Sequence, residues 1–331
     1  MPKAGGHLQP SNPAGKKNQK SPDRKVADET YRGQFQIVKH HYVPQFLLRR
    51  WTTETGRLHC FSVRNGRLVC SERAPEYTGF EKDLYGILAN ALGVGEDHLE
   101  KRFFGPIDSN AARVLDKLEQ HAVLTEDEQI AWTFFLSSLR VRQPDVLRFL
   151  RNEGMRRLRA TLAARDRETL LEGWPTTEEW FNRNHPGVME AMALTNWLPK
   201  MILHDGVMDA FASMRWWLRE FDADQPALLL SDLPIHWEGG FTSEEFMIQL
   251  PLGPRRAFFG ARSAETEQIL DRIPPAELIR RVNLTTVAAA ADRIWACERA
   301  DAAAFIEANL DKIGVNVVAF DTLAPAFAVD L

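Results

Sequence analysis

The middle of the chain restricts the fold most, because residues 125 to about 212 have helical patterns while the segments on both sides have strand character. A capping box, Thr125-Glu126-Asp127-Glu128, begins this region, since its threonine oxygen and last glutamate can satisfy each other's backbone amides. The helix that follows is expected to reach about Val141, and Pro144 breaks it before another helix over Val146–Arg165. We therefore predict a layer of consecutive helices here.

A β-hairpin is predicted ahead of this layer, over Leu58–Ser71. Its two-residue turn, Asn65-Gly66, is typical of hairpins that need positive φ at both turn positions. That turn places Cys60 opposite Ser71 and Phe61 opposite Cys70, so the two sulfurs lie on opposite faces of the ribbon. We expect both cysteines to be free thiols.

The remaining elements complete an α+β pattern. Strand signals recur at Met214–Leu218, Ala227–Leu230 and Phe246–Pro251, and helical patterns follow at Ala264–Arg272 and Pro275–Cys297. Two apolar segments near the ends, Phe35–Val43 and Val315–Phe320, are also expected to be strands. We predict a mainly α-helical α+β fold in which a helical layer packs on a small, mostly antiparallel sheet with an N-terminal β-hairpin.

Composition indicates one folded domain behind a polar tail. Residues 1–34 are rich in Gly, Pro, Ser, Asn and Lys, which predicts a disordered tail with nucleic-acid contact as an alternative, and residues 35–331 should form a single composite domain. The formal net charge is −4, and the chain has three cysteines, too few for a secreted disulfide framework. Without a signal peptide or a window of ~20 apolar residues, we expect a cytoplasmic protein with no membrane contact. Oligomeric state is not indicated.

Polar residues at the ends of predicted elements are the candidates for chemistry. Tandem His40 and His41 precede Pro44, and histidine serves as a proton shuttle or metal ligand near neutral pH. Neighbours on a strand point to opposite faces, so only one of them, His41, is expected to be functional. The alternative is that one histidine bonds a backbone carbonyl in the core while the other is exposed.

Four more candidates each have a structural alternative. Asp83 is a metal ligand or a plain helix cap, and Asp232 is a ligand or the start of an Asx turn before proline. Arg142 is a clamp for phosphate or carboxylate, or a cap for the last carbonyls of a helix. Glu100 lies eight residues before Asp108, so the two share a helix face unless the helix breaks, and such pairs are usually solvated.

A series of motifs is spread along the chain: His41-Tyr42-Val43-Pro44-Gln45-Phe46, Leu48-Arg49, the hairpin, Glu81 to Tyr85, Glu100, Arg142 to Pro144, Ser231-Asp232-Leu233-Pro234, Leu250-Pro251-Leu252, Asn283 and Ala291-Asp292-Arg293-Ile294-Trp295. With these motifs the chain resembles the bacterial family called domain of unknown function 4238, over about residues 36 to 297. Gly105-Pro106 and Asp108 depart from the pattern, because relatives tend to have a glutamate at the latter position on an uninterrupted helix. The resemblance implies no assigned activity, and it implies relatives that occur near mobile-element and phage-defence genes.

Three functions remain open after motif analysis. No G-x-x-x-x-G-K, G-x-G-x-x-G, H-E-x-x-H, C-x-x-C or G-x-S-x-G pattern is present, which disfavours nucleotide kinases, dinucleotide dehydrogenases, zincins and α/β hydrolases. The first hypothesis is a metal-assisted, nuclease-like hydrolase of phosphodiesters with a divalent ion as cofactor. Its proposed groups are His41 as ligand or base, Glu100 as second carboxylate, Arg142 as clamp, and Asp83 and Asp232 as further metal ligands.

The second hypothesis is a non-catalytic recognition module. Arginine and tryptophan are typical interface anchors, and its surface would use Arg64, Arg67, Arg142, Trp216 and Trp217. The third is that the matching polar residues form a buried network that specifies the fold.

Overall fold

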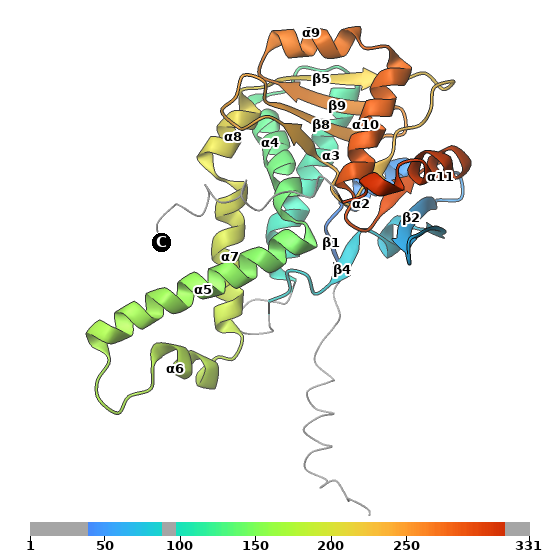
Figure 1. The fold of residues 1–331 in the computed structure, drawn as a ribbon. Coiled ribbons are helices and arrows are strands. Elements are labelled where there is room, and N and C mark those ends of the chain that lie inside the picture. The colour runs from blue at the N-terminus through green and yellow to red at the C-terminus, as the bar shows by residue number, and fades with distance from the viewer. Residues whose placement is uncertain (1–38, 88–96, 315–331) are drawn as a thin grey trace, which may run out of the picture. The chain divides into compact units, whose positions relative to one another are not determined.

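The computed structural model describes residues 39–87 and 97–314 (Figure 1). All of these residues belong to one compact unit. The predicted tail, residues 1–34, and the predicted strand Val315–Phe320 lie outside the described residues.

The predicted helical layer is confirmed. It contains α4 (Glu126–Val141), α5 (Pro144–Thr169), α6 (Thr177–Asn184), α7 (Val188–Ile202) and α8 (Asp205–Ala212) (Figure 1). Both hydrogen bonds of the predicted capping box are present. Glu128 N donates to Thr125 Oγ1 at 3.4 Å, and Thr125 N donates to Glu128 Oε2 at 2.9 Å. The α4 helix packs on α7 and α8, and α5 packs on α7.

An irregular turn opens the helix that packs against α4. Residues Glu100–Phe104 form a π-helical turn, after which α3 (Gly105–Glu119) continues as a regular helix. Pro106 has no N–H and its ring excludes the carbonyl four residues before it, so a wider turn accommodates it. The helix is therefore irregular just before Gly105-Pro106, where an interruption was expected, but it does not end there.

All strand pairs in the described residues are antiparallel. One sheet has the order β3-β2-β10-β6, a second has the order β5-β9-β8-β7, and a two-stranded sheet pairs β1 with β4. Their bounds are β1 Lys39–His41, β2 Leu58–Arg64, β3 Arg67–Arg73, β4 Phe80–Lys82, β5 Arg215–Glu220, β6 Leu230–Ser231, β7 His236–Glu238, β8 Met247–Gly253, β9 Arg256–Ala261 and β10 Ile294–Ala296.

The hairpin has the predicted register. Cys60 pairs with Ser71 and Phe61 pairs with Cys70. The turn has φ of 51° at Asn65 and 72° at Gly66, as its type requires. Cys60, Cys70 and Cys297 are free thiols, as predicted for the first two.

The C-terminal part corrects one prediction. The helix expected over Pro275–Cys297 ends at Ala289 (α10, Pro275–Ala289), and Ile294–Ala296 instead form β10 between β2 and β6. Helical propensity there is overridden by strand pairing with segments far away in the sequence. The other elements are α2 (Gln45–Leu48), α9 (Ala264–Arg272), α11 (Ala300–Glu307) and short turns at Arg49–Trp51, Pro75–Tyr77 and Leu310–Lys312.

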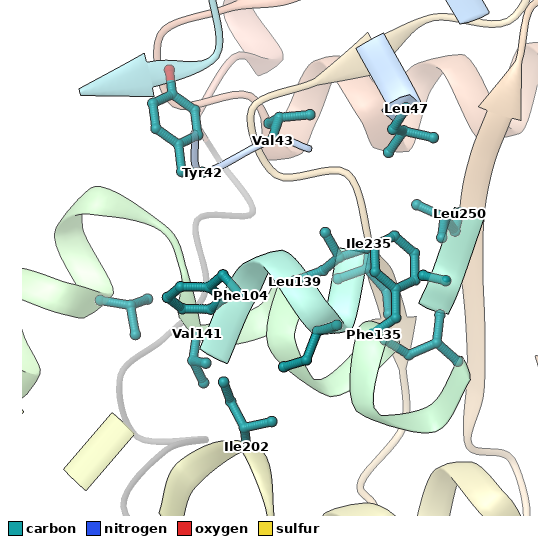
Figure 2. Packing of buried hydrophobic residues seen from close by; sticks show 14 of the residues in the cluster. Tyr42, Val43, Leu47, Phe104, Phe135, Leu139, Val141, Ile202, Ile235 and Leu250 are labelled. Atoms are coloured by element: carbon teal, nitrogen blue, oxygen red, sulfur yellow. The ribbon is translucent and has the colours of Figure 1, made fainter. Parts of the chain in front are cut away.

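The main core joins the helical layer to the sheets (Figure 2). Leu47 from α2, Phe135 and Leu139 from α4, and Leu250 from β8 are all fully buried in it. This core holds the segment after β1 against the end of α4, which brings the polar ends of these elements near one another. Among the described residues no helix has the length and apolar character that crossing a membrane requires.

Candidate functional site

A pocket of about 360 Å³ forms where five segments distant in sequence meet. We call it the five-segment pocket. It is lined by Tyr42, Phe80, Glu81, Gln143, Pro144, Asp145, Val146, Arg148, Asp232, Leu233, Ala291, Asp292 and Arg293.

The Tyr42 wall is fixed by a close backbone approach. The backbone N–H groups of Tyr42 and Val43 both donate to the Gly79 carbonyl, at 3.0 and 3.2 Å. Gly79 has φ of +64°, and a Cβ there would lie 2.9 Å from Leu48 Cδ1, so glycine alone fits. Burial, and then the charge of Asp232, raise the pKa of the Tyr42 hydroxyl, which keeps it a hydrogen-bond donor at neutral pH.

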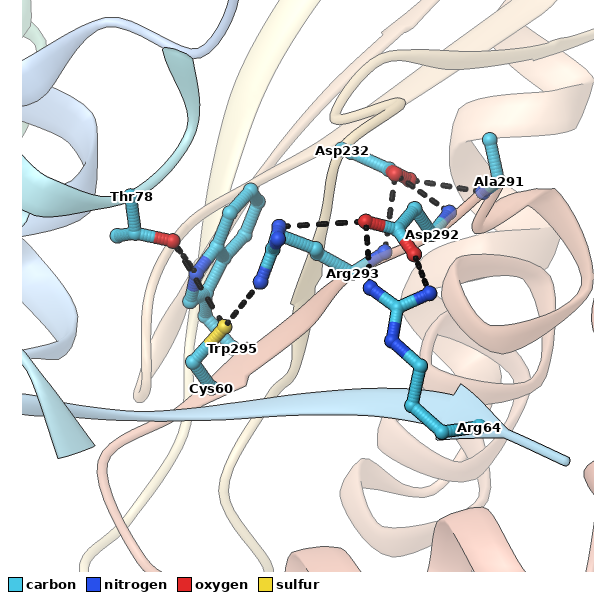
Figure 3. A network of polar contacts seen from close by, with 8 residues as sticks. All are labelled: Cys60, Arg64, Thr78, Asp232, Ala291, Asp292, Arg293 and Trp295. Carbon is cyan, nitrogen blue, oxygen red and sulfur yellow. Dashed lines mark hydrogen bonds and ion pairs between the residues drawn. The ribbon is translucent and has the colours of Figure 1, made fainter. Parts of the chain in front are cut away.

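Asp232 anchors the opposite wall through backbone amides (Figure 3). Its Oδ1 accepts from Ala291 N at 2.8 Å, and its Oδ2 accepts from Asp292 N at 2.7 Å and Arg293 N at 2.9 Å. Burial raises the pKa of this carboxyl to about 6, although the three N–H groups act in the other direction. Asp232 thus holds the loop that leads from α10 into β10.

That loop carries a chain of polar contacts (Figure 3). Arg293 donates to the Cys60 sulfur at 3.5 Å and its Nε lies 3.3 Å from a carboxylate oxygen of Asp292. Arg64 of β2 pairs with the same Asp292 at 3.0 Å. The Asp292 carboxylate at the pocket rim is therefore already neutralised by two arginines.

The N-terminal turn of α5 forms the third wall. Arg148 donates to both carboxylate oxygens of Glu81, at 2.9 and 3.0 Å, and to Asp145 at 2.8 Å. Gln143, the N-cap residue, is only 5% exposed, and its Nε2 is buried without a hydrogen-bond partner among the described residues.

A buried cluster of ionisable residues includes Arg142, the C-cap residue of α4. Arg142 is fully buried and donates two hydrogen bonds to the Asp108 carboxylate. Its Nη1 lies 3.1 Å from Oδ2, and its Nη2 lies 2.9 Å from Oδ1. Its Nη2 also donates to Ser138 Oγ at 2.7 Å, and its guanidinium carbon lies 4.6 Å from the centre of the Phe104 ring. Burial raises the pKa of Asp108, and the Arg142 charge acts against that rise.

Tyr85 connects this pair to the histidines. Its hydroxyl donates to Glu100 Oε2 at 2.7 Å and lies 3.2 Å from the His41 carbonyl oxygen. Its backbone N–H donates to His40 Nδ1 at 3.3 Å, and the two rings stack with centres 4.2 Å apart. Burial raises the pKa of Glu100 and lowers that of His40. We refer to these five residues, His40, Tyr85, Glu100, Asp108 and Arg142, as the buried cluster.

A family model described as "Protein of unknown function (DUF4238)" matches residues 39–300. The chain belongs to the DUF4238 family. No curated protein and no solved structure matches it.

In this DUF4238 chain, the residues that we nominated from sequence do not all lie at one site. Glu100 and Arg142 lie in the buried cluster, and Asp232 lines the five-segment pocket. His41 is buried, its Nδ1 lies 3.4 Å from Gln45 Nε2, and burial lowers its pKa to about 4. Asp83 is exposed in a turn with φ of 55°.

The metal prediction gains no support from this arrangement. Within residues 39–87 and 97–314, no group of three or more His, Cys, Asp or Glu side chains is arranged to hold a metal ion. Of the structural alternatives, the one that left a histidine of the tandem pair exposed is wrong, because His40 and His41 are both buried. The usual solvated state also does not apply to Glu100 and Asp108, which both bond inside the buried cluster. Catalytic roles for His41, Glu100 and Arg142 stay predictions.

Gln143, Arg148 and Arg293 are among the pocket residues that were not nominated from the sequence. Gln143 and Arg293 could have been found from the sequence, because they belong to segments that carry the DUF4238 resemblance. A more specific signal is missing for Arg148, which is one of many arginines along α5. Only its position one turn inside the helix start brings it to the pocket.

Proposed function

We propose that this DUF4238 chain binds a small polar molecule in the five-segment pocket. The observation that carries the proposal is the convergence of Tyr42, Glu81, Gln143, Asp232 and Asp292, from five separate segments, on one pocket. Packing alone gives no reason for so many polar side chains to meet at a cavity. Its volume of about 360 Å³ falls within the ~300–1,000 Å³ typical of small-molecule sites.

The pocket walls are held before any ligand arrives, which favours binding because less ordering is needed. The Asp232 carboxylate holds the 291–293 loop through three backbone bonds. The Gly79 carbonyl accepts a hydrogen bond from the Tyr42 backbone. Arg148 donates two hydrogen bonds to Glu81, which keeps Glu81 beside α5. Each wall therefore has a defined position relative to the others.

The pocket is a better recognition site than the Arg/Trp surface suggested by sequence. Arg142 is fully buried against Asp108 and has no exposed group to offer a partner. Trp216 is half-buried and donates its indole N–H to the Phe211 carbonyl at 3.1 Å. We therefore assign recognition to the pocket.

A pocket-filling variant tests this proposal. Thermal unfolding is measured with a panel of sugars, amino acids, nucleosides and nucleotides, on wild type and on Ala291→Trp, which places an indole at the pocket lining. A ligand at a hundred times its dissociation constant adds about 2.7 kcal/mol, which raises the midpoint by several degrees. We expect at least one compound to do so in wild type and in the exposed control Ala163→Trp, and not in Ala291→Trp. A panel without such a compound contradicts the proposal.

A hydrolase of phosphodiesters is the second candidate, and the Asp232 carboxyl favours it. A pKa of about 6 suits a group that accepts and returns a proton near neutral pH, and Asp232 lines the pocket. The metal-assisted form adds a divalent ion with His41 and Asp83 as further ligands. Its first test is thermal unfolding with Mn²⁺, Mg²⁺ or Zn²⁺ on wild type and His41→Ala, where an unchanged midpoint argues against the metal.

Cleavage assays complete the test of the hydrolase. DNA, RNA and small phosphodiesters are incubated with wild type, Asp232→Ala and His41→Ala. Loss of cleavage in both variants supports the named residues, and cleavage that survives in both removes them from the mechanism.

A further inference from the structure

The five-segment pocket has unused hydrogen-bond donors at the start of α5, which indicates the chemistry of its ligand. We propose that the ligand is an organic phosphate of about nucleotide size, whose phosphate group sits on the N-terminus of α5 and is recognised by the Gln143 side-chain amide. This inference rests on the proposed function, because it names the class of ligand that the same pocket takes.

The first observation is the orientation of a long helix. The first turn of α5, Pro144 to Val146, lines the pocket, and the whole helix is 26 residues long. No side chain among the described residues caps that turn, and the backbone bond that closes it runs from Leu147 N to the Gln143 carbonyl at 2.9 Å. Helix N-termini with free amides attract anionic oxygens through those N–H groups and the helix dipole.

The second observation is independent of the helix. Gln143 is 95% buried, since 5% of it is exposed, and its Nε2 has no hydrogen-bond partner within the described residues. A buried amide nitrogen without a partner destabilises the folded protein unless a ligand or water satisfies it. Because Gln143 lines the pocket next to the α5 amides, one anionic group can satisfy both.

The carboxylates of the pocket do not contradict this assignment, because each already has partners within the protein. Glu81 and Asp145 both accept from Arg148. Asp232 accepts from three backbone amides, and Asp292 pairs with Arg64 and Arg293. The Gln143 Nε2 and the uncapped amides of the first α5 turn are donors, and a ligand that brings acceptor oxygens complements them.

The size and lining of the pocket extend the ligand beyond a bare phosphate. Its volume of about 360 Å³ exceeds what one phosphate group fills, and two aromatic residues, Tyr42 and Phe80, line it. Aromatic faces support stacking of a base or another flat ring. A phosphate ester that carries such a ring uses both parts of the pocket.

A comparison of nucleotides with their nucleosides tests whether the pocket recognises the phosphate group. Calorimetric titration of the full chain compares each of AMP, GMP, CMP and UMP with its nucleoside, and inorganic phosphate and citrate are added as separate arms. We expect at least one nucleotide to bind tenfold or more tightly than its nucleoside, and inorganic phosphate to compete with it. Equal affinity for nucleotide and nucleoside overturns the inference. Competition by citrate without competition by inorganic phosphate also overturns it, because the anion site then binds a carboxylate.

Substitution of Gln143 tests its role with a readout that separates binding from folding. Gln143→Met keeps the length of the side chain and removes the unpartnered amide, so we expect tenfold weaker nucleotide binding together with a higher unfolding midpoint of the ligand-free protein. Gln249→Met is the matched control, because Gln249 is buried but does not line the pocket. Unchanged affinity in Gln143→Met overturns the inference. If that variant fails to fold, Arg148→Ala, whose side chain is 53% exposed, must weaken the nucleotide and spare the nucleoside.

The outcomes separate this inference from the proposed function. If uncharged compounds bind in wild type and not in Ala291→Trp, while nucleotides and inorganic phosphate do not bind, the pocket is a ligand site and the phosphate inference fails alone. If no compound of either kind depends on Ala291, both fail.

Discussion

Arg142 and Arg148 lie six residues apart and both donate hydrogen bonds to carboxylates, but they differ in how far they and their partners are buried. Arg142 is fully buried and its partner Asp108 is 23% exposed, whereas the side chain of Arg148 is 53% exposed. A buried pair loses its hydration, so removing one partner leaves an uncompensated charge. An exposed pair keeps most of its hydration and contributes little. This difference predicts that the buried cluster contributes more to stability than the pocket rim does.

The largest expected effect comes from removing the partner of the buried arginine. Asp108→Ala should lower the free energy of unfolding by about 3–5 kcal/mol, because Arg142 stays buried without its counter-charge. Urea denaturation at pH 7 measures it. The matched control is Asp145→Ala, which removes an exposed partner of Arg148 and should cost less than about 1 kcal/mol. Similar losses in both variants would erase the contrast between the two regions.

The pH dependence of stability should also come from buried groups. Burial lowers the pKa of His41 and His236 to about 4 each. The unfolded chain therefore takes up protons first as pH falls from about 6.5 to 4, and stability is lost over that window. The loss is roughly 3 kcal/mol for the fully buried His236.

Asp232 acts with the opposite sign over part of the same window. Burial raises its folded pKa to about 6, so its contribution to stability falls as pH rises from about 4 to 6 and offsets part of the histidine effect. Urea denaturation across pH 4 to 7 should give a shallower slope for His236→Gln than for wild type. The exposed control His185→Gln should leave the slope unchanged, and a slope that His236→Gln does not alter would contradict the prediction.

A smaller effect is expected from the backbone that supports the pocket wall. Gly79→Ala combines a positive φ with a clash against Leu48, while Gly56→Ala has a similar φ of +72° and nothing within 4 Å. Both variants carry the same backbone strain, so their difference isolates the clash, for which we expect about 1–3 kcal/mol. Thermal unfolding measures the difference. If the two variants are equally stable, Gly79 is not required by its close approach.

The smallest expected effect on stability is at the pocket rim itself. Arg148→Ala removes two exposed ion pairs and should change the free energy of unfolding by no more than about 1 kcal/mol. A loss of several kcal/mol by urea denaturation would make the rim structural, and it would remove the difference between the two arginines.

Elements whose signals are local follow from the sequence alone. The capping box at Thr125 marks the start of α4, because both of its hydrogen bonds close within three residues. The Asn65-Gly66 turn likewise determines the hairpin register through the two residues that turn the chain. Membership in the DUF4238 family followed from motifs that could also be read directly.

The places where the polar motifs meet depend on tertiary packing. The strand Ile294–Ala296 exists because β2 and β6 flank it and Asp232 fixes the loop before it, and none of these partners is near in sequence. The candidate residues Glu100 and Arg142 were visible as polar types, but their separation from the five-segment pocket was not. Local hydrogen bonds are encoded within a few residues, whereas a pocket depends on the packing of segments from Tyr42 to Arg293, which no single window of the sequence contains.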